Sequence, residues 1–134
     1  MSIENTDSNK IKYNLEILEK AYKMLESFIT HKSSEQEQAG IIKSFEFCYE
    51  LSWKIMKRIL SEKGVDVSSP KDVFREAAKN KLINNPKPWF EFLKKRNRTV
   101  RTYNLEIVKD VMEVIDEFKI EVRDLINSIK ETSI

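Results

Sequence analysis

Arg96, Arg98 and Arg101 lie within six positions of one another, and their type and spacing suit chemistry with an anion. Each guanidinium offers a fixed fork of N–H donors that matches the oxygens of phosphate or carboxylate. Asn97 adds an amide that can orient a ligand, and Tyr103 adds a hydroxyl and an aromatic face for stacking. The pattern predicts an anion-binding site. The alternative is a solvated basic helix end, where cations complement the helix dipole.

A helix must bring these side chains to one place. Pro86 or Pro88 is expected to open this helix, which is expected to end around Arg98 to Arg101. Its apolar residues fall on one face at spacings of three and four: Trp89, Phe92 and Leu93. The helix is therefore predicted to be amphipathic, with one face in a core and a cationic end.

The composition indicates one all-α domain. The chain has 134 residues, of which only two are Gly and three are Pro. Its residues are 40% hydrophobic and 34% charged, a composition that suits a helical protein better than a sheet protein. A domain of this length can bury roughly two-thirds of its unfolded surface. We expect a single domain over residues 1–134, with its core from about 8 to 130.

Membrane-spanning and disulfide-bonded proteins are not favoured by the sequence. No window approaches the length of apolar sequence, roughly 18 residues, that a membrane span needs. The polar N-terminus lacks the apolar region of a signal peptide. Cys48 is the only cysteine, which leaves no intrachain disulfide and no cysteine metal cage. A cytoplasmic location is the expectation.

The positive charge of the chain is concentrated in one segment. The formal net charge is +2, but residues 71–101 alone carry +7, which leaves −5 for the remainder. Such a concentration suggests an anionic partner, such as a nucleotide, RNA or an acidic protein face. Ordinary solubility is the alternative explanation.

Two predicted helices carry heptad-like seams. The first is expected to run from a cap at Asp7 or Ser8 to about Thr30, and the fifth from Asn104 to about Lys130. Their apolar residues recur at spacings of three and four: Ile11, Leu15, Leu18, Tyr22, Leu25 and Ile29, then Val108, Val111, Ile115, Phe118, Val122, Leu125 and Ile129. This spacing predicts an antiparallel bundle with both helices in one layer. Further apolar residues of the fifth helix are expected to leave surface for a homodimer: Ile107, Met112 and Ile126.

The second predicted helix is expected to be central. It should begin after overlapping capping boxes at residues 33–34 and end near Lys63, with Gly64 supplying a left-handed turn. Its apolar positions cover more than one stripe, which predicts neighbours on two sides. A short third helix is expected over residues 71–80, with Pro70 at its start.

Glu46, Glu50 and Lys54 of the second helix lie at four-residue spacing. They would form an exposed salt-bridge ladder, each pair contributing roughly a few tenths of a kcal/mol. Alternatively, the two carboxylates would hold the arginines of the predicted anion site. Trp53 and Trp89 are expected to support that site from the core.

Three segments in this order resemble one known family. They are residues 40–54 (GIIKSFEFCYELSWK), 69–77 (SPKDVFREA) and 89–104 (WFEFLKKRNRTVRTYN). Together they are similar to the nucleotidyltransferase substrate-binding protein family, which belongs to the HEPN superfamily and is related to HepT-type toxins. The resemblance implies an up-and-down bundle of four or five helices that forms a homodimer. It also implies a separate small nucleotidyltransferase subunit that carries Mg²⁺ and the transfer chemistry, with no cofactor in this chain.

The ribonuclease motif of HEPN proteins is an Arg, four to six residues, a His, one residue and a Tyr. Arg96 and Tyr103 match the Arg and the Tyr, and Arg101 stands where the His is expected. Histidine can accept a proton near neutral pH, whereas arginine stays protonated. Losing a general base typically costs about 10² to 10⁴ in rate. His31, the only histidine, is expected to be a surface residue in a turn.

Three functions follow from these observations. The favoured one is a non-catalytic, substrate-binding subunit of a two-component nucleotidyltransferase, which binds a nucleotide or other anionic substrate through five residues: Arg96, Asn97, Arg98, Arg101 and Tyr103. The alternative is a HEPN-type ribonuclease toxin of a toxin–antitoxin pair, in which Arg96 and Tyr103 would be catalytic. In the toxin–antitoxin branch the matching tyrosine also receives nucleotides from the partner. The third is an assembly protein whose arginines only form ion pairs with the carboxylates of the second helix.

Overall fold

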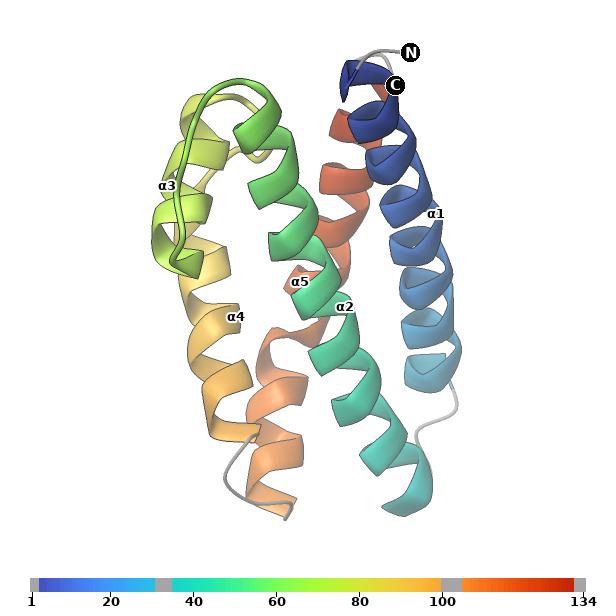
Figure 1. The fold of residues 1–134 in the computed structure, drawn as a ribbon. Helices are drawn as coiled ribbons and strands as arrows, with labels where there is room; N and C mark the ends of the chain where they lie inside the picture. Colours follow the sequence, from blue (N-terminus) through green and yellow to red (C-terminus); the bar gives the residue numbers. More distant parts are fainter. Residues whose placement is uncertain (1–2, 31–34, 100–104, 132–134) are drawn as a thin grey trace.

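Five α-helices make up the part of the chain that the computed structural model describes, namely residues 3–30, 35–99 and 105–131 (Figure 1). They are α1 (Ile3–Thr30), α2 (Glu35–Glu62), α3 (Pro70–Lys79), α4 (Pro86–Thr99) and α5 (Leu105–Glu131). The described residues contain no strand, and the all-α prediction is confirmed. None of these helices is long and apolar enough to cross a membrane.

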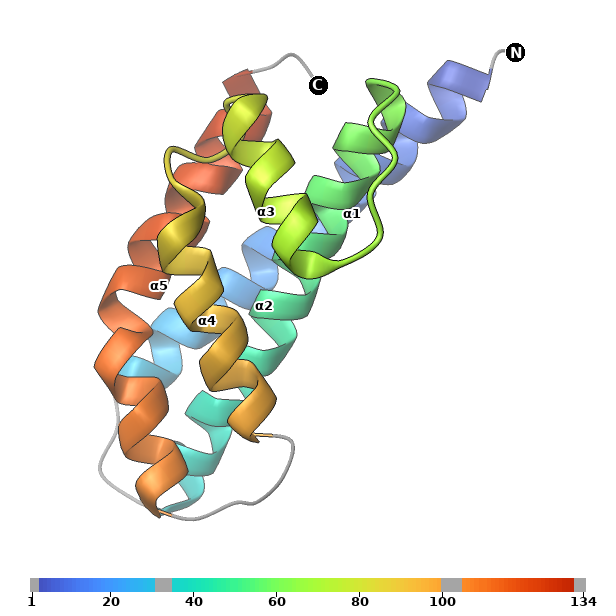
Figure 2. The ribbon, with the colours of Figure 1, turned by 90° about the vertical axis from the view of Figure 1, so that its left-hand side faces the viewer.

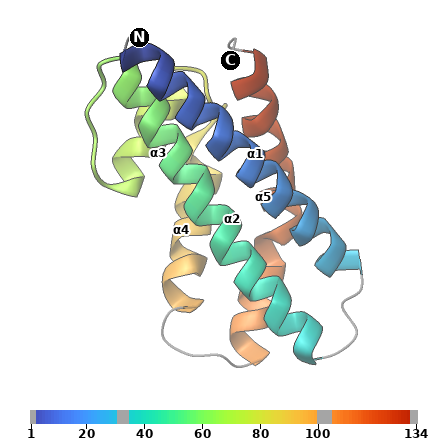
Figure 3. The ribbon, with the colours of Figure 1, turned by 45° about the vertical axis from the view of Figure 1, so that its right-hand side comes forward.

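The helix α2 is the centre of the bundle. It contacts each of the other four helices, as its several apolar stripes predict (Figures 1 and 3). The helices α1, α4 and α5 run up and down beside it, and α1 also contacts α5 with the opposite chain direction. The short α3 packs against α2 and α4 (Figure 2). The antiparallel bundle predicted from the heptad seams, and the up-and-down arrangement that the resemblance implies, are therefore confirmed.

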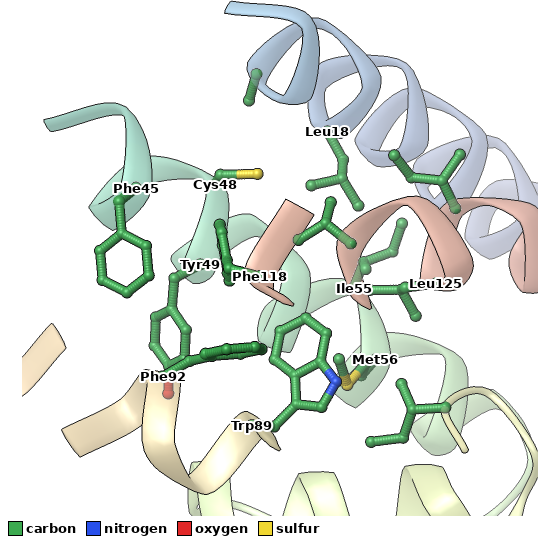
Figure 4. Close-up of a cluster of buried hydrophobic side chains, with 14 of the residues drawn as sticks. Leu18, Phe45, Cys48, Tyr49, Ile55, Met56, Trp89, Phe92, Phe118 and Leu125 are labelled. Carbon is green, nitrogen blue, oxygen red and sulfur yellow. The ribbon is translucent and has the colours of Figure 1, made fainter. Parts of the chain in front are cut away.

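An aromatic cluster fills the core between α2, α3, α4 and α5 (Figure 4). Its members come from four helices and are all buried: Phe45, Tyr49, Phe74, Trp89, Phe92 and Phe118. The rings of Phe92 and Phe118 are 5.0 Å apart and nearly perpendicular, and those of Phe45 and Phe118 are 4.8 Å apart. Edge-to-face pairs of this kind add to the area burial that already stabilises the core. Through these contacts the cluster packs α4 against the other helices of the bundle.

Two expectations about the long helices are wrong in detail. The first helix begins at Ile3 and not after Asp7 or Ser8, because no Gly or Pro interrupts the helical sequence of this segment. On α5, Ile107 and Ile126 are buried within the chain, so of the three residues expected to leave surface for a homodimer only Met112, which is partly buried, keeps any. The large hydrophobic side chains that are exposed lie mainly on α1 and α2: Tyr13, Met24, Phe47 and, on α5, Ile120.

The predicted ends of α2 and α3 are confirmed by their backbone hydrogen bonds. Gly64 has a φ of +83°, and Val65 N–H donates to the Leu60 carbonyl at 2.9 Å. A second bond from Gly64 N–H to the Ser61 carbonyl completes the pattern that closes many helices through a left-handed residue. Pro70 occupies the first turn of α3, and the side chain of Ser69 accepts from the backbone N–H of Asp72.

Replacing Gly64 by alanine is expected to lower the free energy of unfolding by about 1 kcal/mol, because a Cβ is disfavoured at positive φ. No atom lies within 4 Å of the added Cβ, so the cost is one of backbone conformation alone. Urea denaturation followed by circular dichroism measures the change. Lys63→Ala, one residue earlier, is the control and should be nearly neutral. Equal stability of both variants would contradict the left-handed turn.

Candidate anion-binding site at the end of α4

The last turn of α4 carries three of the five predicted site residues. Arg96 is partly buried there, whereas Asn97 and Arg98 are exposed. The predicted residues Arg101 and Tyr103 lie outside the residues that the structure describes. The end of α4 lies beside α2 and α5, which supply the charged partners of its arginines (Figure 1).

Arg96 lies between two carboxylates of α2. Its Nε is 3.4 Å from Glu50 Oε1 and its Nη1 is 3.9 Å from Glu46 Oε2. The Arg96 side chain is only 23% exposed, and its Nε is buried without a hydrogen bond of good geometry. The interpretation in which the carboxylates hold an arginine is therefore confirmed for Arg96. The ladder is also present, since Lys54 Nζ is 3.8 Å from Glu50 Oε2.

Two further side chains fix the carboxylates, through contacts that were not predicted from the sequence. The hydroxyl of Thr99, which is 2% exposed, lies 2.9 Å from Glu46 Oε2 and 2.7 Å from the Arg96 carbonyl oxygen. Its single proton can be donated to either oxygen. Trp53 Nε1 donates to Glu50 Oε2 at 3.2 Å, so Trp53 supports the site through its N–H as well as by packing. The spacing of Trp53 three residues after Glu50 was the available signal for this contact.

Asp110 of α5 holds the other side of the α4 end. Arg98 Nη1 is 2.9 Å from Asp110 Oδ2, and Lys95 Nζ is 3.8 Å from Asp110 Oδ1 and 3.1 Å from Glu113 Oε2. The Arg98 side chain remains 55% exposed, so several of its N–H donors face solvent. Asn97 has no side-chain partner among the described residues. Arg98 and Asn97 are thus the members of the described cluster best exposed to a ligand.

Two buried residues of α2 that precede Glu50 in the sequence, Cys48 and Tyr49, hold their protons. Burial raises the pKa of Tyr49, the charge of Glu50 raises it further, and Arg96 opposes this effect. The Tyr49 hydroxyl is buried without a hydrogen-bond partner in the described part of the chain. Burial also raises the pKa of Cys48 to about 12, so its thiol stays protonated at neutral pH. Neither group is suited to accept a proton there.

The described neighbours of Arg96 form no site for a metal, since no group of three or more His, Cys, Asp or Glu side chains gathers within the described ranges. Arg96 and Arg98 are both paired within the chain, as the assembly hypothesis expects. However, Arg98 is half exposed and Asn97 lies beside it, so part of the cluster stays open to an anion. The arrangement can bind negative charge, with the arginines positioned before a ligand arrives.

Comparisons with known proteins agree on one family. The family model for nucleotidyltransferase substrate binding protein-like chains matches residues 13–131. The Haemophilus influenzae protein named "Probable ribonuclease HepT" is 33% identical over an aligned length of 137 residues. The match covers 90% of this chain and 94% of that protein.

Solved structures share the fold. A Haemophilus influenzae protein described as having the fold of a substrate binding domain of a nucleotidyltransferase is 31% identical, with a TM-score of 0.78 over 87% of this chain and 98% of the other. A tri-AMPylated Shewanella oneidensis HEPN toxin, solved with its MNT antitoxin, is 21% identical, with a TM-score of 0.73 over 90% of this chain and 96% of the toxin. At that identity the likeness concerns the fold alone. This chain belongs to the family of nucleotidyltransferase substrate binding protein-like chains.

Proposed function

We propose that this chain is the non-catalytic, substrate-binding subunit of a two-component nucleotidyltransferase. A separate small subunit would carry Mg²⁺ and the transfer chemistry. The observation that carries the proposal is Arg101, which occupies the motif position where HEPN ribonucleases have histidine. Arginine binds an anion but stays protonated, so it serves binding and not proton transfer.

The ligand would be a nucleotide or another anion. Arg98 and Asn97 are exposed on the last turn of α4, and Arg101 and Tyr103 follow within five residues. Arg96 would contribute the guanidinium N–H donors that do not face Glu46 and Glu50, while these carboxylates hold its orientation. An arginine positioned in advance loses less conformational entropy when it binds.

A ribonuclease toxin is the second candidate, and the name of the Haemophilus influenzae relative favours it. In that function Arg96 and Tyr103 would act on RNA, and a nucleotidyltransferase would be the antitoxin, as MNT is for the Shewanella oneidensis toxin. Tyr103 would be the group that the partner modifies. For either function we propose a homodimer, with exposed apolar residues of α1 and α2, such as Met24 and Phe47, as candidates for the contact.

Replacing Arg96 by alanine is expected to weaken the binding of ATP, used as the probe nucleotide, by about 10- to 100-fold. This is the range for losing a hydrogen bond to a charged group, roughly 1.5–3 kcal/mol. The variant should stay folded, although Glu46 and Glu50 lose their shared cation at a cost of about 1–2 kcal/mol. Titration calorimetry measures the affinity, and circular dichroism checks the fold.

The matched control for this experiment is Arg123→Ala, which removes an exposed arginine from α5, away from the end of α4. Its affinity for ATP should stay within twofold of the unmodified protein. Equal affinity of the Arg96 and Arg123 variants would remove Arg96 from the site. Failure of the unmodified protein to bind ATP alone or with a co-expressed nucleotidyltransferase would count against the proposed function.

A further inference from the structure

A surface hollow of about 600 Å³ lies along the C-terminal half of α2, and no arginine of α4 lines it. Asn14 of α1 forms part of its wall, and α2 supplies the rest. Three cations of α2 line it: Lys54, Lys57 and Arg58. Its apolar surface includes Leu51 and Trp53, both partly buried. Its volume falls within the roughly 300–1,000 Å³ that is typical of ligand sites.

The hollow carries net positive charge. Lys57 and Arg58 have no carboxylate partner among the described residues, and Lys54 has only the 3.8 Å contact with Glu50. Glu62 is the one acidic residue in the wall. Residues three and four apart on a helix have their Cβ atoms about 5–6 Å from one another. The three cations therefore form a single short row on the solvent-facing side of α2.

Trp53 gives the hollow an aromatic surface with a fixed orientation. Its Nε1 donates to Glu50 Oε2 at 3.2 Å, which restrains the ring on α2. The other tryptophan of the chain, Trp89, is completely buried in the core. A row of cations beside a restrained aromatic ring is the combination that binds single-stranded nucleic acid, because the cations track phosphates while the ring stacks on a base.

We propose that the hollow binds a single-stranded nucleic acid segment. Lys54, Lys57 and Arg58 contact successive phosphates, one base stacks against Trp53, and Asn14 can offer its side-chain amide to the base or sugar. A peptide of Asp and Glu alone would match the cations but has no ring to stack on Trp53. The proposal goes beyond a nucleotide site on α4, and it does not require Arg96 to bind a ligand.

The test measures the affinity of the full chain for a fluorescein-labelled uridine 12-mer by anisotropy at several salt concentrations. The double variant Lys57→Glu/Arg58→Glu should weaken binding at least tenfold. It should also reduce the magnitude of the slope of log K against log salt concentration by about 1.4, which is roughly 0.7 for each lost phosphate contact. The matched control is Lys71→Glu/Lys87→Glu, which changes the charge equally at exposed positions of α3 and α4. Equal weakening by both double variants, or none by the first, would overturn the proposal.

Intrinsic fluorescence provides a second readout that identifies the ligand class. The uridine 12-mer should quench part of the tryptophan emission, and Trp53→Phe, which leaves only the buried Trp89, should abolish this quenching. A poly-glutamate peptide of the same charge should bind at least tenfold more weakly. If the peptide binds as tightly as the 12-mer and no quenching occurs, the hollow takes an acidic protein segment and the nucleic acid proposal is wrong.

The same titration separates this proposal from the function proposed for α4. Lys57→Glu/Arg58→Glu should leave the affinity for ATP within threefold, since both residues line the hollow and neither lies at the end of α4. Weakened 12-mer binding with retained ATP binding in this double variant supports a separate site at the hollow. If this double variant retains ATP binding and binds the 12-mer as tightly as the unmodified protein, the inference about the hollow is wrong. The proposal for the α4 site would be unaffected.

Discussion

Replacing Trp89 by alanine is expected to lower the free energy of unfolding by about 3–5 kcal/mol, the range for large aromatic side chains in well-packed cores. The Trp89 side chain is completely buried, and its ring centroid lies 5.2 Å from Phe92, 5.5 Å from Phe74 and 6.2 Å from Phe118. Its removal opens a cavity where α3, α4 and α5 meet. Since a domain is typically stable by only about 5–15 kcal/mol, urea denaturation should show a much lower midpoint.

Two controls show whether packing is the cause. Ile120→Ala shortens a side chain of α5 that is 46% exposed and should cost less than about 1 kcal/mol. Trp89→Phe keeps most of the packing and should cost clearly less than Trp89→Ala, because the buried Trp89 Nε1 has no hydrogen bond of good geometry to lose. The indole N–H does lie near Glu121. Burial and the charge of Asp124 raise the pKa of this carboxyl group, and the indole opposes them. Equal losses for Trp89→Ala and Ile120→Ala would contradict the central place of Trp89 in the core.

Replacing Arg101 by histidine is expected to create RNA cleavage in excess chelator, about 10² to 10⁴ times faster than any cleavage by the unmodified protein. The substitution restores the order of arginine, histidine and tyrosine, with Arg96 and Tyr103 unchanged. An imidazole can take the proton of a ribose 2′-hydroxyl near neutral pH, which a guanidinium cannot do. Gel analysis of a labelled RNA measures the rate.

Arg98→His is the matched control, because it places an imidazole three residues earlier, outside the motif, and should remain inactive. Cleavage by the unmodified protein would overturn the non-catalytic function and make the chain a ribonuclease with another base. If neither the unmodified protein nor the Arg101 variant cleaves RNA, the missing histidine is not what separates this chain from a ribonuclease. The proposed binding function would then rest on nucleotide affinity and on the nucleotidyltransferase partner.

The pairing at the end of α4 affects all three hypotheses. Glu46 and Glu50 hold Arg96 on one side, and Asp110 holds Arg98 on the other. These contacts fasten α4 to α2 and α5, as an assembly role requires. They also hold the arginines in place for an anion, as a binding role requires. Binding experiments separate the two roles, because ion pairs that only stabilise assembly give no affinity for ATP.

The local features of the fold could be read from the sequence. The spacing of Leu15, Leu18 and Leu25 identified the buried face of α1, because a period near 3.6 residues places them on one side of any helix. Gly64 and Pro70 marked the end of α2 and the start of α3, because glycine permits the left-handed conformation that ends a helix and proline fixes a φ that suits its first turn. The order of three motifs was sufficient to suggest the family.

The partners of the site could not be read in the same way. Thr99 and Glu46 are 53 residues apart, and their contact depends on how α4 is rotated about its axis and placed against α2. In the same way, the placement and rotation of α5 buried Ile107 and Ile126, which periodicity alone had left for a homodimer. The hollow also depends on how two helices are placed, because Asn14 of α1 lines it together with the cations of α2. By itself, the sequence determined which residues share a helix face, since that follows from backbone geometry within a few turns. Only the tertiary structure decided which faces meet, because packing of the whole core sets the position and rotation of each helix.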